Sequence, residues 1–250
     1  MGTQKRVETF RYEGLELKHL DIHYVFLLEV YVLNLYRANL LTKNDIVIDA
    51  GAGIGEFTIL ASRKIGPGGR VIAIEPDPSD YELLQLNIKK NNCANVVPIN
   101  IGLGENTGER QMEFRGRSYS FRVDTLENIL GKVGLKKRIN FIKMDIEGFE
   151  TEVLSQSIDT IKNADTIAIE LHNTKEEVDR ILSKYNFRFT PISKRIIYYQ
   201  LFKNLFLHPR LMFTSYMRMK HHPRLLSYAA KGLEYSTNYN FLCGTYKREK

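Results

Sequence analysis

The sequence predicts an α/β fold with a mostly parallel sheet, helices on both faces and an antiparallel closing strand. Between residues 45 and 192, short apolar segments alternate with segments of helical periodicity, which is the pattern of parallel strands connected by helices. The segments 187–191 and 239–246 are expected to form a closing pair of strands at the two ends of a long insertion. These two features define the fold class before any motif is considered.

The elements of this domain follow in a regular order. Strands are expected over 45–49, 70–75, 96–100, 141–145 and 166–171, and helices over 56–64, 79–91, 151–162 and 175–185. The glycine- and proline-rich segment 66–69 predicts a tight turn before the second strand. A polar stretch extends through Ser120, and a further helix is expected to be opened by Asp124, with Glu127 completing a capping box.

One domain with additions at both ends accounts for the whole chain. At 250 residues the chain can bury one sizeable core. The expected parts are an N-terminal helical extension (1–44), the α/β core (45–192), a basic and aromatic insertion that acts as a lid (193–237), and the closing strand with a tail (238–250).

The composition indicates a globular protein of a reduced compartment. The two cysteines, Cys93 and Cys243, lie far apart and outside any CxxC pattern, which disfavours zinc and thioredoxin-like chemistry. The polar segment 1–10 has no signal-peptide pattern, so a cytoplasmic protein is expected. The apolar run 24–41 contains too many polar residues for a membrane span, namely Glu29, Asn34, Arg37 and Asn39.

The segment 49–55 carries the first candidate ligand site. It reads Asp-Ala-Gly-Ala-Gly-Ile-Gly, ends a strand and opens a helix. Its alternate glycines let the backbone bend tightly and approach a ligand, and they are Gly51, Gly53 and Gly55. The GxGxG spacing does not imply a pyrophosphate. With Asp49 beside it, the loop suits the amino-acid moiety of S-adenosylmethionine, whose ammonium group needs a carboxylate; an ordinary strand-to-helix turn is the alternative.

A second acid strengthens this interpretation. The second strand ends at Glu75, 26 residues after Asp49, where a carboxylate can accept both hydroxyls of an adenosine ribose. Pro76 and Asp77 then turn the chain beneath the adenine. The alternative is an exposed glutamate at a strand end, and the combination with the glycine loop disfavours it.

Several further segments follow the same order as a known family. Three motifs come first along the chain: Val-Ile-Asp-Ala-Gly at 47–51, Gly-Glu-Phe-Thr at 55–58 and Ala-Ile-Glu-Pro-Asp-Pro at 73–78. Related motifs follow at 101–105, 125–127, 142–150 and 169–172. Over about residues 45–190, the chain resembles the FkbM-type S-adenosylmethionine-dependent methyltransferase family. The resemblance implies a Rossmann-like class I methyltransferase fold and adds four cofactor-binding residues: Phe57, Thr58, Ile101 and Gly102. Family members commonly have Asn where Gly53 stands and Asp where Glu127 stands, but neither change removes a group that the chemistry needs.

Acidic residues and a histidine follow two neighbouring strands. Asp145 and Glu147 end one strand, and Glu170 and His172 end the next. Ligands of such sheets bind outside the carboxyl ends of the strands, so these four side chains are expected to converge, with Asp145 facing the methyl donor. They can supply a general base or hold a divalent cation such as Mg²⁺. Helix capping by Glu147 and a structural role for His172 are the alternatives. Two further acids are interpreted as helix-surface charges: Glu150 and Glu152.

The positive charge is concentrated in the C-terminal quarter. Residues 188–250 hold 12 Lys and Arg against two Glu, a net charge of +10, and the rest of the chain has a net charge of −3. Cations mixed with aromatic residues in the insertion are typical of a nucleic-acid platform. They are also typical of a membrane-surface helix. A solvated helical lid packed on the domain is the favoured interpretation.

These features predict an S-adenosylmethionine-dependent O-methyltransferase that acts on a hydroxyl of a sugar, glycan or other small molecule, because the resemblance implies hydroxyl acceptors. The alternative is an RNA (tRNA) methyltransferase, which the basic C-terminal region and the segment 87–92 suggest. Against RNA, residues 145–148 read Asp-Ile-Glu-Gly and not the Asn-Pro-Pro type of motif that binds a base amine. An inactive cofactor-binding or lipid-surface adaptor is a third class, and the retained acids disfavour it.

Overall fold

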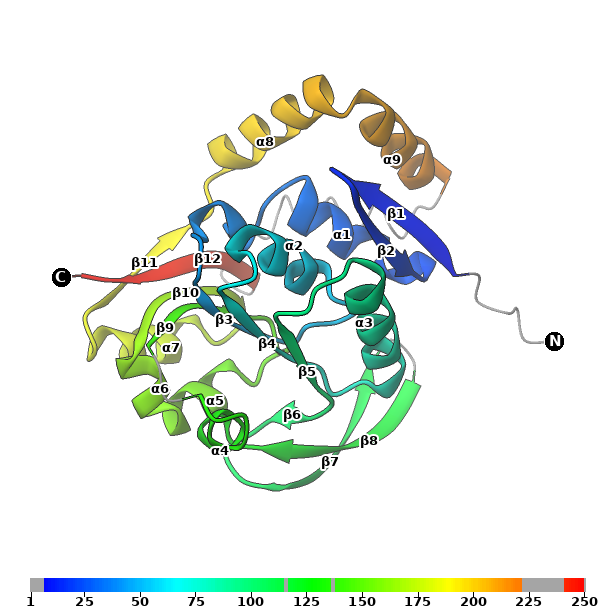
Figure 1. Ribbon diagram of the computed structural model, residues 1–250. Helices are drawn as coiled ribbons and strands as arrows, with labels where there is room; N and C mark the ends of the chain where they lie inside the picture. Colours follow the sequence, from blue (N-terminus) through cyan, green and yellow to red (C-terminus); the bar gives the residue numbers. More distant parts are fainter. Residues whose placement is uncertain (1–6, 115–116, 136–137, 222–240, 250) are drawn as a thin grey trace.

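A seven-stranded sheet forms the centre of the computed structural model, which describes residues 7–114, 117–135, 138–221 and 241–249 (Figure 1). Its strands are β3 (Ile46–Ala50), β4 (Arg70–Ile74), β5 (Val96–Ile99), β9 (Ile139–Met144), β10 (Ala164–His172), β11 (Phe187–Pro191) and β12 (Phe241–Arg248). Their order is β11-β12-β10-β9-β3-β4-β5. Only β12 runs antiparallel to its neighbours, β10 and β11, so the predicted mostly parallel sheet with an antiparallel closing strand is confirmed.

The strands are apolar on both faces because two layers of helices cover the sheet. Side chains alternate between the faces of a strand, so Val47 and Ile48 enter different cores. Helices α1 (Tyr24–Tyr31), α2 (Glu56–Ile65) and α3 (Pro78–Lys90) share the core of Val47. Helices α4 (Leu126–Lys132), α5 (Glu150–Gln156), α6 (Ile158–Lys162) and α7 (Lys175–Ser183) share the core of Ile48.

Two helix boundaries differ from the expectation. The N-cap of α4 is Thr125, whose side chain accepts from the backbone N–H of Asn128, whereas Asp124 ends a strand and binds Lys132. The expected single helix over 151–162 is divided at Ser157 into α5 and α6.

The polar stretch before α4 is a second, smaller sheet. Its strands are β6 (Gly102–Leu103), β7 (Gly108–Phe114) and β8 (Arg117–Asp124), in the order β6-β8-β7. Polar residues dominate β7 and β8, so the alternating apolar pattern that predicts a strand is weak there.

The N-terminal segment is not wholly helical, which corrects the expectation for residues 1–44. It begins with a hairpin of β1 (Glu8–Tyr12) and β2 (Leu15–His19), followed by the 3₁₀ turn η1 (Asp21–His23), α1 and the 3₁₀ turn η2 (Ala38–Leu40). The two turn residues, Glu13 and Gly14, have φ values of 46° and 79°, which is the backbone of a tight type I′ hairpin. The outer edge of β2 is bound by side chains of α3, because Asn87 and Asn91 hydrogen-bond the backbone of Lys18 and Glu16.

The insertion forms two helices that arch over the N-terminal segment: α8 (Lys194–Leu207) and α9 (Pro209–His221) (Figure 1). The buried Asn204 donates to the carbonyl oxygen of Val32 at 3.0 Å, and the hydroxyls of Tyr24 and Ser215 lie 2.8 Å apart. The remainder of the predicted insertion, from residue 222, lies outside the described residues. Within the described ranges, no helix combines the length and apolarity needed to cross a membrane.

Candidate active site

A cleft opens where β3, β4 and β9 end, and it encloses about 980 Å³ of space not filled by atoms, with the solvent at its open mouth included. This is the edge of the sheet at which α/β proteins bind ligands. Three regions line it. The strand ends contribute Gly51, Gly53, Glu75, Asp77, Asp145 and Glu147, the N-terminal segment contributes Phe26, Glu29, Val30 and Tyr36, and the small sheet contributes Gly102, Arg110, Met112 and Tyr119. The described residues of α8 and α9, which belong to the segment expected to act as a lid, contribute no lining side chain.

The glycine loop brings the ends of neighbouring strands together. Gly51 has a φ of 74°, and a Cβ built on it would lie 1.8 Å from the carbonyl oxygen of Asp145. Any larger residue would therefore separate the end of β3 from that of β9. The N–H of Gly53 donates to Glu75 Oε2 at 2.7 Å, which joins the loop to the end of β4.

Asp49 lies beneath this loop and not in the cleft. It is fully buried, accepts from Thr58 Oγ1 at 2.5 Å, and has Lys143 Nζ 3.4 Å from its Oδ1. Burial raises the pKa of Asp49. Burial alone would lower the pKa of Lys143, but the charges of Asp49 and Asp145 have the larger effect, so the pKa of Lys143 is raised. Asp49 shares the face of Val47, which packs toward α2, so its side chain points into the protein. The other predicted cofactor residues outside the lining are Gly55, Thr58 and Ile101.

Glu75 lines the cleft, as do Pro76, Asp77 and Phe57. Its Oε1 accepts the N–H of Asp77 at 2.8 Å, and its Oε2 accepts that of Gly53. Burial, helped by the charge of Asp80, raises the pKa of Glu75 to about 8 although these hydrogen bonds favour the carboxylate. Each oxygen keeps a second lone pair that can accept a hydroxyl from a ligand.

The four predicted catalytic residues come together at the ends of β9 and β10. His172 Nε2 lies 4.0 Å from Asp145 Oδ1, 3.6 Å from Glu147 Oε2 and 4.0 Å from Glu170 Oε1. Asp145 and Glu147 line the cleft, and Glu170 and His172 lie behind them. Burial and the charge of Asp145 raise the pKa of Glu170 to about 7. Burial alone would lower the pKa of His172. A hydrogen bond to Glu150 and the neighbouring negative charges together have the larger effect and raise this pKa to about 9.

The interpretation of Glu150 and Glu152 as surface charges is wrong. Glu150 is fully buried and accepts from His172 Nδ1 at 2.8 Å and from Thr174 Oγ1 at 2.9 Å. Glu152 pairs with Arg110 from the small sheet. Helix α5 starts directly behind the strand ends, so its first turn faces other elements. The N-cap of α5 is Phe149, so Glu147 does not occupy the capping position.

Two functional candidates from the N-terminal segment were not predicted. The Tyr36 hydroxyl oxygen lies 2.7 Å from Asp145 Oδ2 and 3.0 Å from Glu170 Oε2, so its one proton can be donated to either carboxylate, and the hydroxyl joins the two. Glu29 lines the cleft, and burial together with the charges of Glu170 and Asp145 raises its pKa well above the usual range. A glutamate inside an apolar run was a usable signal for Glu29, whereas a tyrosine in such a run carries none.

The cluster also has donors that suit a cation. Asp145, Glu147 and His172 each offer one ligand atom, and these atoms lie within 4.8 Å of one another. The second nitrogen of His172 is held by Glu150, as is common for metal-bound histidines. The cluster is therefore chemically able to move a proton, and three of its side chains are able to hold a divalent ion.

Residues 49–189 match the family profile described as the methyltransferase FkbM domain. This chain belongs to the FkbM methyltransferase family. The matched region holds the glycine loop, Glu75 and all four residues of the acid and imidazole cluster. The core of the protein is therefore an S-adenosylmethionine-dependent methyltransferase domain, as the resemblance of its motifs predicted.

Curated relatives of the FkbM domain differ in what their names say they modify. The chain is similar to Methyltransferase 1 of Beauveria bassiana (26% identity; 53% of this chain, 66% of the relative) and to the hexuronic acid methyltransferase AglP of Haloferax volcanii (25%; 57% and 63%). A shorter stretch, 25% of this chain and 24% of the relative, is 44% identical to a tRNA(Phe) (4-demethylwyosine(37)-C(7)) aminocarboxypropyltransferase of Methanocaldococcus jannaschii. The chain thus spans less than two thirds of each of these relatives.

A solved structure shows the same fold. The tRNA m1G37 methyltransferase of M. jannaschii superimposes with a TM-score of 0.51 at 12% identity, over 100% of this chain and 59% of that one. At this identity the likeness concerns the fold and not the acceptor.

Proposed function

We propose that this protein is an O-methyltransferase that transfers the methyl group of S-adenosylmethionine to a hydroxyl of a sugar, glycan or other small molecule. The proposal rests chiefly on the linked carboxylates Asp145 and Glu170, which Tyr36 joins at the edge of the cleft. A neutral alcohol is a poor nucleophile, so an acceptor hydroxyl needs a group that takes its proton.

Carboxylates that line the cleft support binding of the methyl donor there. When bound, S-adenosylmethionine supplies an electrophilic methyl group on a cationic sulfur. Glu29 and Glu56 line the cleft, and burial raises the pKa of both, that of Glu56 to about 7, so a cation beside them favours their ionised forms. Gly53 leaves room beside Glu56, because a Cβ there would lie 2.8 Å from Glu56 Oε2. We assign the ribose hydroxyls to Glu75.

In this proposal, Asp145 takes the proton of the acceptor hydroxyl while the acceptor oxygen forms its bond to the methyl carbon. The bond between that carbon and sulfur would break at the same time, with S-adenosylhomocysteine as the leaving group. Tyr36 then donates its proton to Glu170 as it accepts one from Asp145, so the proton leaves the cleft. A pKa near 7 suits Glu170 for this exchange at neutral pH. His172 lies beside Asp145 and is itself fixed by its hydrogen bond to Glu150, so this pair positions the carboxylate of Asp145.

The RNA alternative has a specific observation for it and one against it. The tRNA-modifying relative shares a short, more identical segment with the chain. However, the asparagines that suggested RNA are occupied within the protein, since Asn87 is fully buried and both Asn87 and Asn91 bind the backbone of β2. We therefore keep RNA as the second candidate.

Transfer of an isotope-labelled methyl group tests the acceptor class. The full-length protein is incubated with labelled S-adenosylmethionine and separate pools of free sugars, uronic acids, glycans and RNA. Mass spectrometry is expected to locate the label on a sugar or small-molecule oxygen, and Asp145→Asn is expected to lower its transfer at least about a hundredfold. Label in RNA alone would overturn the proposal in favour of the second candidate.

A chelator separates the two uses of the cluster. With a carboxylate as proton acceptor, activity is expected to be the same with and without EDTA. If EDTA abolishes activity and Mg²⁺ or Mn²⁺ restores it, Asp145, Glu147 and His172 hold a cation and the proton path described above is wrong.

A further inference from the structure

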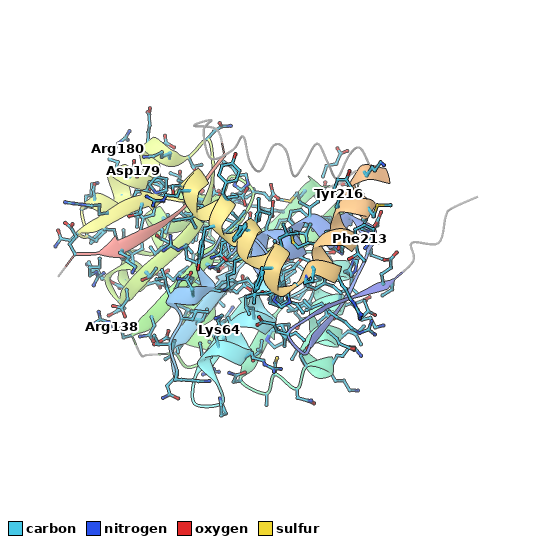
Figure 2. All side chains as sticks on the ribbon, turned by 90° about the horizontal axis from the view of Figure 1, so that it is seen from above. Lys64, Arg138, Asp179, Arg180, Phe213 and Tyr216 are labelled. Carbon is cyan, nitrogen blue, oxygen red and sulfur yellow. The ribbon has the colours of Figure 1, made fainter. Side chains whose placement is uncertain are left out.

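Large apolar side chains are gathered on the outer surface of α8 and α9. Eight of them are exposed there: Tyr198, Tyr199, Phe202, Leu205, Phe206, Leu207, Phe213 and Tyr216. In the rest of the described chain only Val7, Ile22 and Leu86 are comparably exposed. Figure 2 looks down on this helix pair, with Phe213 and Tyr216 labelled on α9. Phe206 is 81% exposed and Phe202 is 73% exposed, so the helices do not shield one another.

The sequence of α8 explains why this face needs a partner. A helix on a protein surface normally has one apolar face and one polar face. In α8, Ile197 and Asn204 are buried against the domain, yet apolar residues also occupy most of the outer positions. Contiguous apolar patches of this kind mark contact with another molecule or a membrane.

The apolar face, which we call the α8–α9 face, carries cations and no acids. Four exposed basic residues belong to it: Arg195, Lys203, Arg210 and Lys220. No Asp or Glu occurs between Asp179 and Glu234. Arg218 is not counted because it pairs with Glu8 and Asp21. The net positive charge of the face therefore remains available to an anionic surface.

We propose that the α8–α9 face docks on the surface of an anionic lipid bilayer. The aromatic and leucine side chains enter the boundary between head groups and acyl chains, and the flanking Lys and Arg contact lipid phosphates. A symmetric second copy would bring together two faces that each carry cations and no acid. RNA would leave the apolar run Leu205–Leu207 without a chemical match. The docking holds whatever the acceptor of the cleft is, because this face lies on the far side of the N-terminal segment.

Vesicle sedimentation of the full-length protein tests the proposal. The protein is expected to sediment with vesicles of phosphatidylcholine mixed with phosphatidylglycerol, but not with phosphatidylcholine alone. Phe206→Ser combined with Phe213→Ser is expected to abolish this binding. Lys203→Gln and Arg210→Gln are each expected to weaken it about fivefold, and added salt is expected to weaken it further.

Matched controls keep the result specific. Leu86→Ser removes an exposed apolar side chain from α3, and Lys64→Gln removes an exposed cation from α2; neither is expected to change vesicle binding. Circular dichroism of each variant verifies that it is folded. The proposal is overturned if the wild-type protein does not sediment with anionic vesicles. It is also overturned if sedimentation velocity shows a dimer that Phe206→Ser dissociates, or if the face binds RNA but not lipid.

Discussion

The two sides of the cleft are built differently. The strand-end side consists of short connections at the ends of β3, β4 and β9, and hydrogen bonds such as that from Gly53 to Glu75 fix them to one another. The N-terminal side consists of α1 and the chain after it, which pack on the sheet domain and are covered on their outer surface by α8 and α9. The strand ends can hold the methyl donor in a position dictated by the sheet. The N-terminal side is a separate layer that can differ in shape without disturbing the sheet.

This difference suggests a division of work, in which the strand ends bind the methyl donor and provide the proton acceptor and the N-terminal side shapes the acceptor site. Tyr36 connects the two sides, since it comes from the N-terminal segment and binds Asp145 and Glu170. Substitutions on either side can therefore test the division directly.

The largest effect is expected from Asp145→Asn on the strand-end side. Loss of the proton acceptor is expected to lower kcat by about 10²- to 10⁴-fold while cofactor affinity changes little. Steady-state kinetics and calorimetry with S-adenosylhomocysteine measure the two quantities. Asp165→Asn, at the opposite end of β10, is the matched control. A large loss of cofactor affinity in Asp145→Asn would mean that this acid binds the donor.

A smaller effect, on binding, is expected from Glu75→Ala. Loss of two ribose contacts is expected to cost about 2–3 kcal/mol of cofactor affinity. Ribose hydroxyls favour the carboxylate, and burial raises the pKa of Glu75 to about 8, so wild-type affinity is expected to rise as pH increases toward that value and to level off above it. Calorimetry across pH checks both points, with the exposed Glu82→Ala as control. Unchanged affinity in folded Glu75→Ala would remove the ribose assignment.

The same division explains what the sequence could predict. The mostly parallel strands, the glycine loop, Glu75 and the cluster around Asp145 follow from local patterns, because the carboxyl ends of parallel strands must meet at one edge. The contacts of Glu150 and Tyr36 depend on how α5 and the N-terminal segment pack, and no local pattern encodes that packing. Even a correctly placed motif residue can face inward, as Asp49 does.

Tyr36→Phe tests the connection between the two sides. Without the hydroxyl, Asp145 and Glu170 lose their shared donor, and kcat is expected to fall about tenfold to a hundredfold with little change in cofactor affinity. Tyr31→Phe is the matched control on the same segment, because the buried Tyr31 hydroxyl has no hydrogen-bond partner among the described residues. Equal kinetics in the two variants would exclude Tyr36 from the proton path.

The smallest effect on the chemistry is expected from Asn204→Ala. Asn204 lies on α8 and contacts the N-terminal side on the surface that faces away from the cleft. Asn204 is 2% exposed, donates to the carbonyl oxygens of Val32 and Gln200, and accepts from the Tyr12 hydroxyl at 3.3 Å. Its loss removes these side-chain hydrogen bonds and is expected to cost about 1–3 kcal/mol of unfolding free energy, measured by urea denaturation against the exposed Thr214→Ala. If the N-terminal side shapes the acceptor site, KM for the acceptor rises while the Kd for S-adenosylhomocysteine stays constant. A weaker Kd with an unchanged KM would show that the two sides do not divide the work in this way.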